Sequence, residues 1–173
     1  RLAFQVVLQC APLLKRLKVS CVISLEETLY EGLKELLGDT DISYWRLSCS
    51  EGKCLVLFYR PDELERYLSS PKIRSLIYEY GYLDMSLERM LVRLCSRVEA
   101  FAELGMGFPH EIGAFLGYPP DDVKGFIENE GGKYLMIGYW KVYSNPAKAR
   151  MIFKEYDRAK DCAVNEFITG KSI

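Results

Sequence analysis

A β-hairpin predicted over residues 42–60 constrains the fold more than any other feature of the sequence. Residues 42–49 and 54–60 are rich in β-branched and aromatic side chains, and a connection of four residues separates them. So short a connection joins antiparallel strands, because a parallel pair needs a crossover of about a dozen residues or more. Further strands are predicted near 19–25 and 134–143, without a regular alternation of strand and helix. We therefore expect an α+β fold with a small, mainly antiparallel sheet covered by helices.

Two long helices are predicted from hydrophobic periodicity and capping residues. One extends from Met85 onward, and Asn145 followed by Pro146 predicts the start of the other. In the first helix, apolar residues recur at steps of three and four and so share one face: Leu87, Met90, Leu91, Leu94, Val98 and Phe101. The second is expected to bury Ile152, Phe153, Tyr156, Ala163 and Phe167.

Shorter helices are predicted from apolar spacing and prolines. Residues 2–17 are apolar enough for a helix that breaks or restarts at Pro12. Residues 26–37 have helical spacing, and Pro61 and Pro71 each stand where a helix can begin.

Length, composition and charge narrow the class of protein. With 173 residues, 49% hydrophobic and 27% charged, the chain is expected to form one domain, residues 1–173, with its own core. Its longest apolar runs, 19–25 and 134–140, are much shorter than the roughly 20 residues that cross a bilayer. The net charge of -1 provides no positive field for nucleic acid. We expect a cytoplasmic protein that binds neither membranes nor nucleic acid.

Six cysteines and one histidine limit the metal and disulfide chemistry. The sequence has no CxxC pair and therefore no zinc-finger pattern, and no metal site is predicted. Mostly reduced, buried thiols are expected, because a chain of this length needs no disulfide framework. Cys49 and Cys54 flank the hairpin turn, where a packing role is favoured and a redox-active disulfide is the alternative.

Residues 110–129 predict a helix, a tight turn and a second helix opened by Asp121 and Asp122. The shape is that of a helix-turn-helix, but the second helix and its end carry four carboxylates and only one amine, that of Lys124. Such a surface repels DNA, so a structural helical hairpin is favoured.

His110 precedes Glu111 at the expected start of the first of these helices. The helix dipole disfavours an imidazolium there, so a neutral His110 is suited to act as a base or a ligand. A capping or packing histidine is the alternative. The pair is not an HExxH zinc motif, because the fourth residue after His110 is Ala114.

Cys10 is the candidate nucleophile. The nearby lysines at 15 and 18 would lower the pKa of its thiol if the fold brought them close. Inert packing in an apolar segment is the alternative for Cys10.

Residues 139–143 combine aromatic and β-branched side chains with one cation, Lys141. A lysine among aromatic rings can hold a planar anion by charge and stacking, although a Lys141 that points to water is the favoured alternative. Arg60, at the end of the hairpin, offers a similar anion contact or a surface ion pair.

Several stretches together carry a family resemblance: CAPLLKRLK, FPHEIGAFLGYPPDDVKGFIEN, GYWKVY and the cysteine of the final helix. They resemble an uncharacterised bacterial family catalogued only as a domain of unknown function. The resemblance spans nearly the whole chain and implies relatives but no reaction. It marks as signature positions Cys10, His110, Glu111, Gly117, Tyr118, Pro119, Asp122, Gly125, Trp140, Lys141 and Cys162.

The leading hypothesis is a thiol-dependent enzyme that acts on a small anionic substrate. Cys10, His110 and Glu111 would be catalytic, with Cys10 as the nucleophile or redox thiol and His110 as its base or orienting partner. The predicted substrate contacts are Arg60, Tyr118, Trp140 and Lys141. One alternative is a non-enzymatic binding module for a planar cofactor, haem or iron. Another is a protein-interaction domain that uses the acidic second helix of residues 110–129. The sequence assigns no cofactor.

Overall fold

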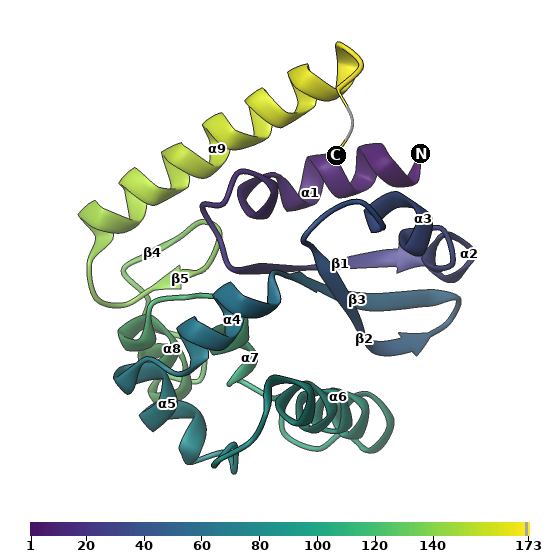
Figure 1. The fold of residues 1–173 in the computed structure, drawn as a ribbon. Helices are drawn as coiled ribbons and strands as arrows, with labels where there is room; N and C mark the ends of the chain where they lie inside the picture. Colours follow the sequence, from purple (N-terminus) through teal and green to yellow (C-terminus); the bar gives the residue numbers. More distant parts are fainter. Residues whose placement is uncertain (172) are drawn as a thin grey trace.

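The computed structural model describes residues 1–171 and 173 and confirms the α+β class. Its main sheet contains β1 (Ser20–Glu26), β2 (Ser43–Ser50) and β3 (Lys53–Tyr59) in the order β1-β3-β2. Both strand pairs are antiparallel, so the predicted hairpin forms and β1 adds to its free edge (Figure 1).

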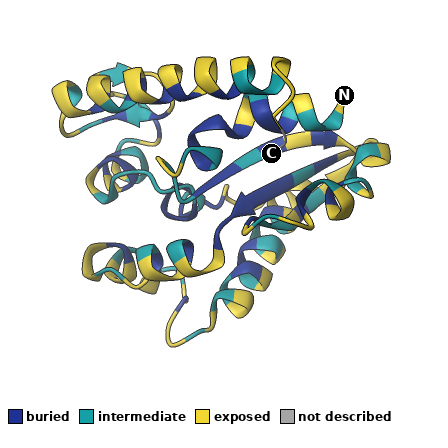
Figure 2. Cartoon of the chain, turned by 45° about the horizontal axis from the view of Figure 1, so that its top comes forward, coloured by how far each residue is buried: buried dark blue, intermediate teal, exposed yellow. Residues whose placement is uncertain are grey.

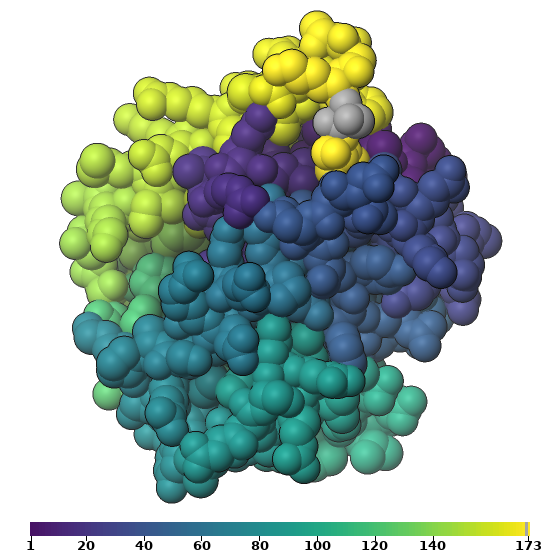
Figure 3. All heavy atoms as spheres, viewed as in Figure 1, coloured from purple at the N-terminus to yellow at the C-terminus, as the bar shows by residue number. Residues whose placement is uncertain are grey.

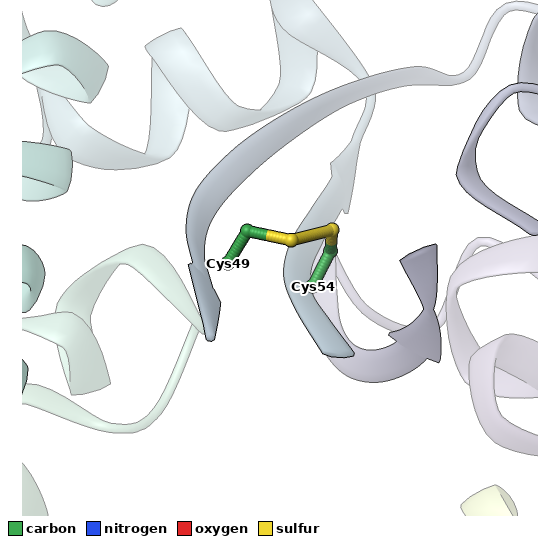
Figure 4. The surroundings of a disulfide bond; sticks show 2 residues. All are labelled: Cys49 and Cys54. Carbon is green, nitrogen blue, oxygen red and sulfur yellow. A yellow bond between two sulfur atoms is a disulfide. The ribbon is translucent and has the colours of Figure 1, made fainter. Parts of the chain in front are cut away.

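The hairpin turn consists of Glu51 and Gly52, which both adopt positive φ, at 51° and 73°. This geometry matches the twist of the two strands and fixes their register, in which Cys49 lies opposite Cys54. The two cysteines form a disulfide with a Cα–Cα distance of 4.1 Å (Figure 4). The favoured packing role was therefore wrong for this pair, whereas Cys10, Cys21, Cys95 and Cys162 are free thiols.

The sheet separates two hydrophobic clusters because successive side chains of β3 point to opposite faces. Cys54, Val56 and Phe58 pack with the helix α1 (Leu2–Leu14), on one face. Leu57 and Tyr59 pack on the other face with helices α4 (Pro61–Leu68), α5 (Pro71–Tyr78) and α6 (Leu87–Leu104). Burial of a side chain such as Phe58 stabilises the fold by about 1.5–3 kcal/mol.

Two helical predictions near the N-terminus are corrected. Helix α1 continues through Pro12 and ends two residues later, so the missing proline N–H affects the last turn alone. The Pro12 carbonyl there accepts the N–H groups of Leu17 and Lys18. The helix expected over 26–37 is divided into α2 (Glu27–Tyr30) and α3 (Leu33–Leu37), and Gly32 lies between them.

The later helices begin at or near the predicted residues; α6 begins at Leu87 rather than Met85, and the helix expected to start at His110 begins at Ile112. Pro61 and Pro71 open α4 and α5, and the Ser86 hydroxyl caps α6 by accepting the Arg89 N–H. Most of the predicted apolar face of α6 is buried or half-buried, but Phe101 is exposed and packs edge-on against Phe108.

The segment after α6 forms α7 (Ile112–Phe115), α8 (Pro120–Glu128), β4 (Met136–Ile137) and β5 (Lys141–Val142). The strand expected over 134–143 is thus a small hairpin of two short strands. A Cβ at Gly138 would lie 2.2 Å from the Phe153 ring, so the turn of this hairpin packs tightly against the last helix.

Helix α9 (Pro146–Ile168) begins at the predicted cap, where Asn145 Oδ1 accepts the Lys148 N–H at 3.0 Å. It lies along α1 and reaches the β4–β5 hairpin (Figures 1 and 3). Its outward side is exposed, whereas most residues of β1 and β3 are buried (Figure 2). Among the described residues, no helix is both long and apolar enough to cross a membrane.

Candidate functional site

A pocket of about 270 Å³ lies between α7, α8 and β5. Its wall is mainly apolar and aromatic, with three polar exceptions that carry an imidazole, a carboxylate and an amine. The lining residues are Phe108, His110, Ile112, Gly113, Leu116, Tyr118, Asp122, Val123, Phe126, Trp140 and Lys141. Apolar walls with a few placed polar groups are typical of small-molecule sites. Four of the predicted site residues, His110, Tyr118, Trp140 and Lys141, therefore share this wall.

Glycines allow the short helix α7 to approach its neighbours. A Cβ at Gly113 would lie 3.0 Å from Val123 Cγ2, so glycine permits close packing of α7 on α8. Gly117 adopts a φ of +72°, which turns the chain sharply after α7. Pro120 then opens α8, one residue before the predicted aspartates.

Asp122 joins α8 to the segment around β5. Its buried carboxylate accepts the Trp140 indole N–H at 2.8 Å on Oδ2. Oδ1 accepts the backbone N–H groups of Tyr143 and Ser144, each at 2.9 Å, and the Ser144 hydroxyl at 2.8 Å. A carboxylate has about four lone-pair positions, two on each oxygen, so Oδ1 is fully used and Oδ2 keeps one position beside the Trp140 N–H. Both oxygens of Asp122 thus hold parts of the pocket wall together.

His110 lies between two aromatic rings of the wall, with centroid distances of 5.4 Å to Phe108 and 5.3 Å to Phe126. Its Nδ1 is buried and has no hydrogen-bond partner among the described residues. A buried polar atom left unpaired costs about 1–3 kcal/mol. Native structures rarely leave such atoms unpaired, and the Nδ1 of a neutral imidazole donates or accepts according to its tautomer.

Lys141 reaches back over the pocket instead of extending into water, which corrects the favoured alternative. Its Nζ donates to the Gly131 carbonyl at 2.7 Å. It also lies over the rings of Phe126 and Tyr134, 5.5 and 5.1 Å from their centroids. An ammonium has three donors, so two N–H groups remain for other acceptors.

Trp140 and Tyr118 form a continuous aromatic wall, with centroids 5.5 Å apart and planes inclined by 30°. Trp140 is further fixed by the edge-on ring of Phe153 at 4.6 Å. Burial raises the pKa of Tyr118, so its phenol is neutral at physiological pH. Lys18 lies outside this wall, with Nζ 5.1 Å from the Tyr118 centroid.

Glu111 is directed away from the pocket, although it follows His110 in the chain. Its fully buried carboxylate forms an ion pair with Arg97 and accepts the Tyr82 hydroxyl at 3.1 Å. The hydrogen bond to Glu111 raises the pKa of Arg97. These contacts give Glu111 a structural role in holding α7 against α6.

Cys10 is not in the pocket wall. It is fully buried in the cluster between α1 and β1, together with Cys21. A hydrogen bond with the Cys21 side chain and burial raise the pKa of Cys10, and the opposing charge of Lys18 is the smaller effect. A nucleophilic thiol needs a lowered pKa. The structure thus gives Cys10 and His110 separate surroundings and gives no support to a thiol nucleophile.

Arg60 lies at a second cavity of about 200 Å³, apart from the aromatic pocket. Its buried guanidinium donates to Asp41 at 2.9 Å and to the Leu13 carbonyl at 2.5 Å. Cys162, on α9, is exposed and lies beside Glu166. Within residues 1–171 and 173, no group of three or more His, Cys, Asp or Glu side chains is placed to hold a metal ion.

Phe108, Phe126 and Asp122 are pocket residues that sequence reasoning did not assign to a site. Phe108 lies two residues before His110 in the chain, so its nearness to a candidate site residue could have marked it. The place of Phe126 depends on how α8 packs against the loop before α7, which no local pattern reveals.

Comparison with known proteins gives one match. A family model described as a protein of unknown function (DUF3793) matches residues 6–173. Neither the curated proteins nor the solved structures contain a match.

Proposed function

Because this chain belongs to the family of proteins of unknown function DUF3793, we propose its function from the pocket itself: it binds a small, flat and largely apolar molecule. The observation that carries the proposal is the buried Nδ1 of His110, which has no partner in an otherwise apolar wall of the described structure. A ligand that hydrogen bonds to this nitrogen would satisfy it and bury its own apolar surface.

The size of the pocket limits the ligand. A cavity of about 150 Å³ lined by apolar residues accommodates one benzene molecule. The pocket of about 270 Å³ therefore suits one ring with substituents or two fused rings. A haem, with four pyrrole rings, exceeds this volume. When haemin or ferrous iron is added to the protein, the visible spectrum of the mixture is expected to equal that of the additive alone.

Binding is better supported than catalysis by the chemistry of the wall. Both Asp122 oxygens accept donors from the protein itself, and burial raises the pKa of the Tyr118 phenol. Neither Cys10 nor Glu111 lines the pocket. The interaction hypothesis also loses one of the four carboxylates of the second helix and its end, because Asp122 is buried while Asp121 is exposed.

A cavity-filling variant tests the proposal. Leu116 lines the pocket, so Leu116→Phe should fill part of it; Leu83→Phe, at an exposed position outside the lining, is the matched control. The probes are indole, benzamide and benzoate at up to about 5 mM, which detects a Kd near 1 mM. Saturation-transfer NMR should show binding to the unmodified chain and to Leu83→Phe but not to Leu116→Phe. Equal binding to all three proteins, or to none, would refute the pocket.

The cysteines bear on the cellular compartment of the protein. We place the protein in the cytoplasm on the support of four free thiols, one of them the exposed Cys162; the Cys49–Cys54 disulfide is the feature that argues for an oxidising compartment. Rapid acid quenching of cells followed by alkylation would test it. An oxidised Cys162 in most molecules would contradict a reducing compartment.

A further inference from the structure

We propose that the pocket ligand is an aromatic carboxylate, with its ring against Tyr118 and Trp140 and its carboxylate on Lys141 and His110. The inference rests on the proposed function and adds the chemical class of the ligand.

The pocket wall offers more free hydrogen-bond donors than free acceptors. Asp122 Oδ1 already accepts three donors, and Oδ2 accepts the Trp140 indole N–H, which leaves at most one acceptor position on Oδ2. Lys141 has two uncommitted N–H groups, and His110 Nδ1, which is unpaired among the described residues, donates in its Nδ1–H tautomer. A ligand that brings acceptors therefore complements this wall better than a ligand that brings donors.

The charge of Lys141 is also incompletely matched. Within the described part of the chain, its ammonium makes no ion pair within 4.0 Å. It is stabilised instead by a carbonyl and by two aromatic faces. A cation held against apolar surface attracts an anion more strongly than one in open water, because the local screening is weaker.

Lys141 and His110 both lie beside Phe126, at centroid distances of 5.5 and 5.3 Å. Both groups therefore border the Phe126 ring, and the Tyr118 and Trp140 rings form another part of the wall. This separation of donors from flat apolar surface matches a molecule with an anionic group on an aromatic ring.

The number of donors favours a carboxylate over a phosphate ester. A carboxylate presents two oxygens and one charge, which two N–H groups of Lys141 and, in the Nδ1–H tautomer, one of His110 can satisfy. A phosphate presents three oxygens and a charge between about -1.5 and -2, and it is usually bound by arginines or by several backbone N–H groups. None of the pocket-lining residues is an arginine.

Paired acids and amides of the same shape test the inference by calorimetry or competition NMR. The pairs are benzoate with benzamide and 2-naphthoate with 2-naphthamide. The unmodified chain should bind each acid at least about tenfold more tightly than its amide, because charge-assisted hydrogen bonds are roughly twice as strong as neutral ones. The advantage should shrink as salt rises from low to high concentration, while binding of the amide changes little.

Two variants assign the preference to a residue. Lys141→Met should bind acid and amide equally, whereas Lys124→Met, which removes an exposed lysine of α8, should retain the tenfold preference. Should Lys141→Met not fold, the salt series on the unmodified chain still shows whether the preference depends on charge. Equal affinities of the unmodified chain for acid and amide would overturn the carboxylate and leave the pocket intact. A preference that survives in folded Lys141→Met would overturn Lys141 as the partner of the carboxylate. Failure of every probe, including indole, would overturn both proposals.

Discussion

The indole N–H of Trp140 donates a hydrogen bond of 2.8 Å to Asp122 Oδ2, and this contact joins the strand side of the pocket to its helix side. The two residues are 18 positions apart, and both side chains are buried. The other Asp122 oxygen holds the chain just after β5. The pocket wall is therefore assembled around one carboxylate rather than around one secondary-structure element.

Asp122→Asn should destabilise the fold by about 2–4 kcal/mol. The amide nitrogen would face donors that the carboxylate now accepts, leaving buried donors unpaired. Denaturant unfolding measures the change. Asp121→Asn is the matched control, since Asp121 is exposed and its pair with Lys72 spans 3.6 Å, so its effect should stay within about 0.5 kcal/mol. Equal losses in both variants would contradict the central role of Asp122.

His110→Phe should leave the ligand-free protein as stable as before or make it more stable by up to about 1 kcal/mol. Phenylalanine keeps the ring between Phe108 and Phe126 and removes an unpaired polar atom. The same variant should bind benzoate more weakly. Thermal unfolding and calorimetry measure the two effects. A large loss of stability would show that His110 has a structural partner instead.

Arg97→Met should destabilise the protein by roughly 3 kcal/mol, because it leaves the buried Glu111 carboxylate with the Tyr82 hydroxyl alone. Arg89→Met, at an exposed position of the same helix, should change stability by less than about 0.5 kcal/mol. Denaturant unfolding distinguishes them. A stable Arg97→Met protein would reopen a role for Glu111 in chemistry.

The Lys15–Glu166 pair should make the contact between α1 and α9 dependent on pH. The hydrogen bond from Lys15, at 2.5 Å, lowers the pKa of Glu166, and the same bond raises the pKa of Lys15. The Glu166 contribution is present above the unfolded pKa and is lost as pH falls through the folded one. The Lys15 contribution is present below its unfolded pKa and is lost as pH rises through the folded one.

The pair therefore stabilises the fold across the neutral range. The Tm advantage of the unmodified chain over Glu166→Gln should be present at about pH 7 and vanish toward about pH 3. An advantage that persists at the acidic end would mean that the carboxylate charge is not its source.

The reactivity of each cysteine should follow the exposure of its thiol. In folded protein, iodoacetamide should modify the exposed Cys162 first, and Cys10 should react at the slow rate of Cys21 at neutral pH. Peptide mass spectrometry reads out each rate. Fast modification of Cys10 would revive the thiol-enzyme hypothesis.

Features with a local physical cause were predictable from the sequence. Asn145 caps α9, prolines open α4 and α5, and a short turn joins β2 to β3, because each depends on neighbouring residues. Pro12 was misjudged because its place in the last turn of α1 depends on where the helix ends, which is set by packing on the sheet.

Part of the candidate site was predictable because some of its residues stand out in local sequence motifs. His110, Tyr118, Trp140 and Lys141 stand out as polar or aromatic types in short motifs, and they line one pocket. The separation of Cys10 from them, and the opposite directions of His110 and Glu111, depend on tertiary packing. A difference of one position in the turn before α7 decides whether a side chain lines the pocket or pairs with Arg97.

Helix α9 links two distant parts of the molecule mechanically. At 23 residues it is about 34 Å long; Phe153 and Tyr156 pack at the β4–β5 hairpin, and Ala163 packs on α1. A continuous helix is stiff over this length, so a displacement at one end tilts the other. Loosening of the hairpin beside the pocket and loosening of α1 are consequently coupled events. Amide hydrogens along α9 should then exchange as one cooperative group, slowed along the whole helix when the pocket is filled.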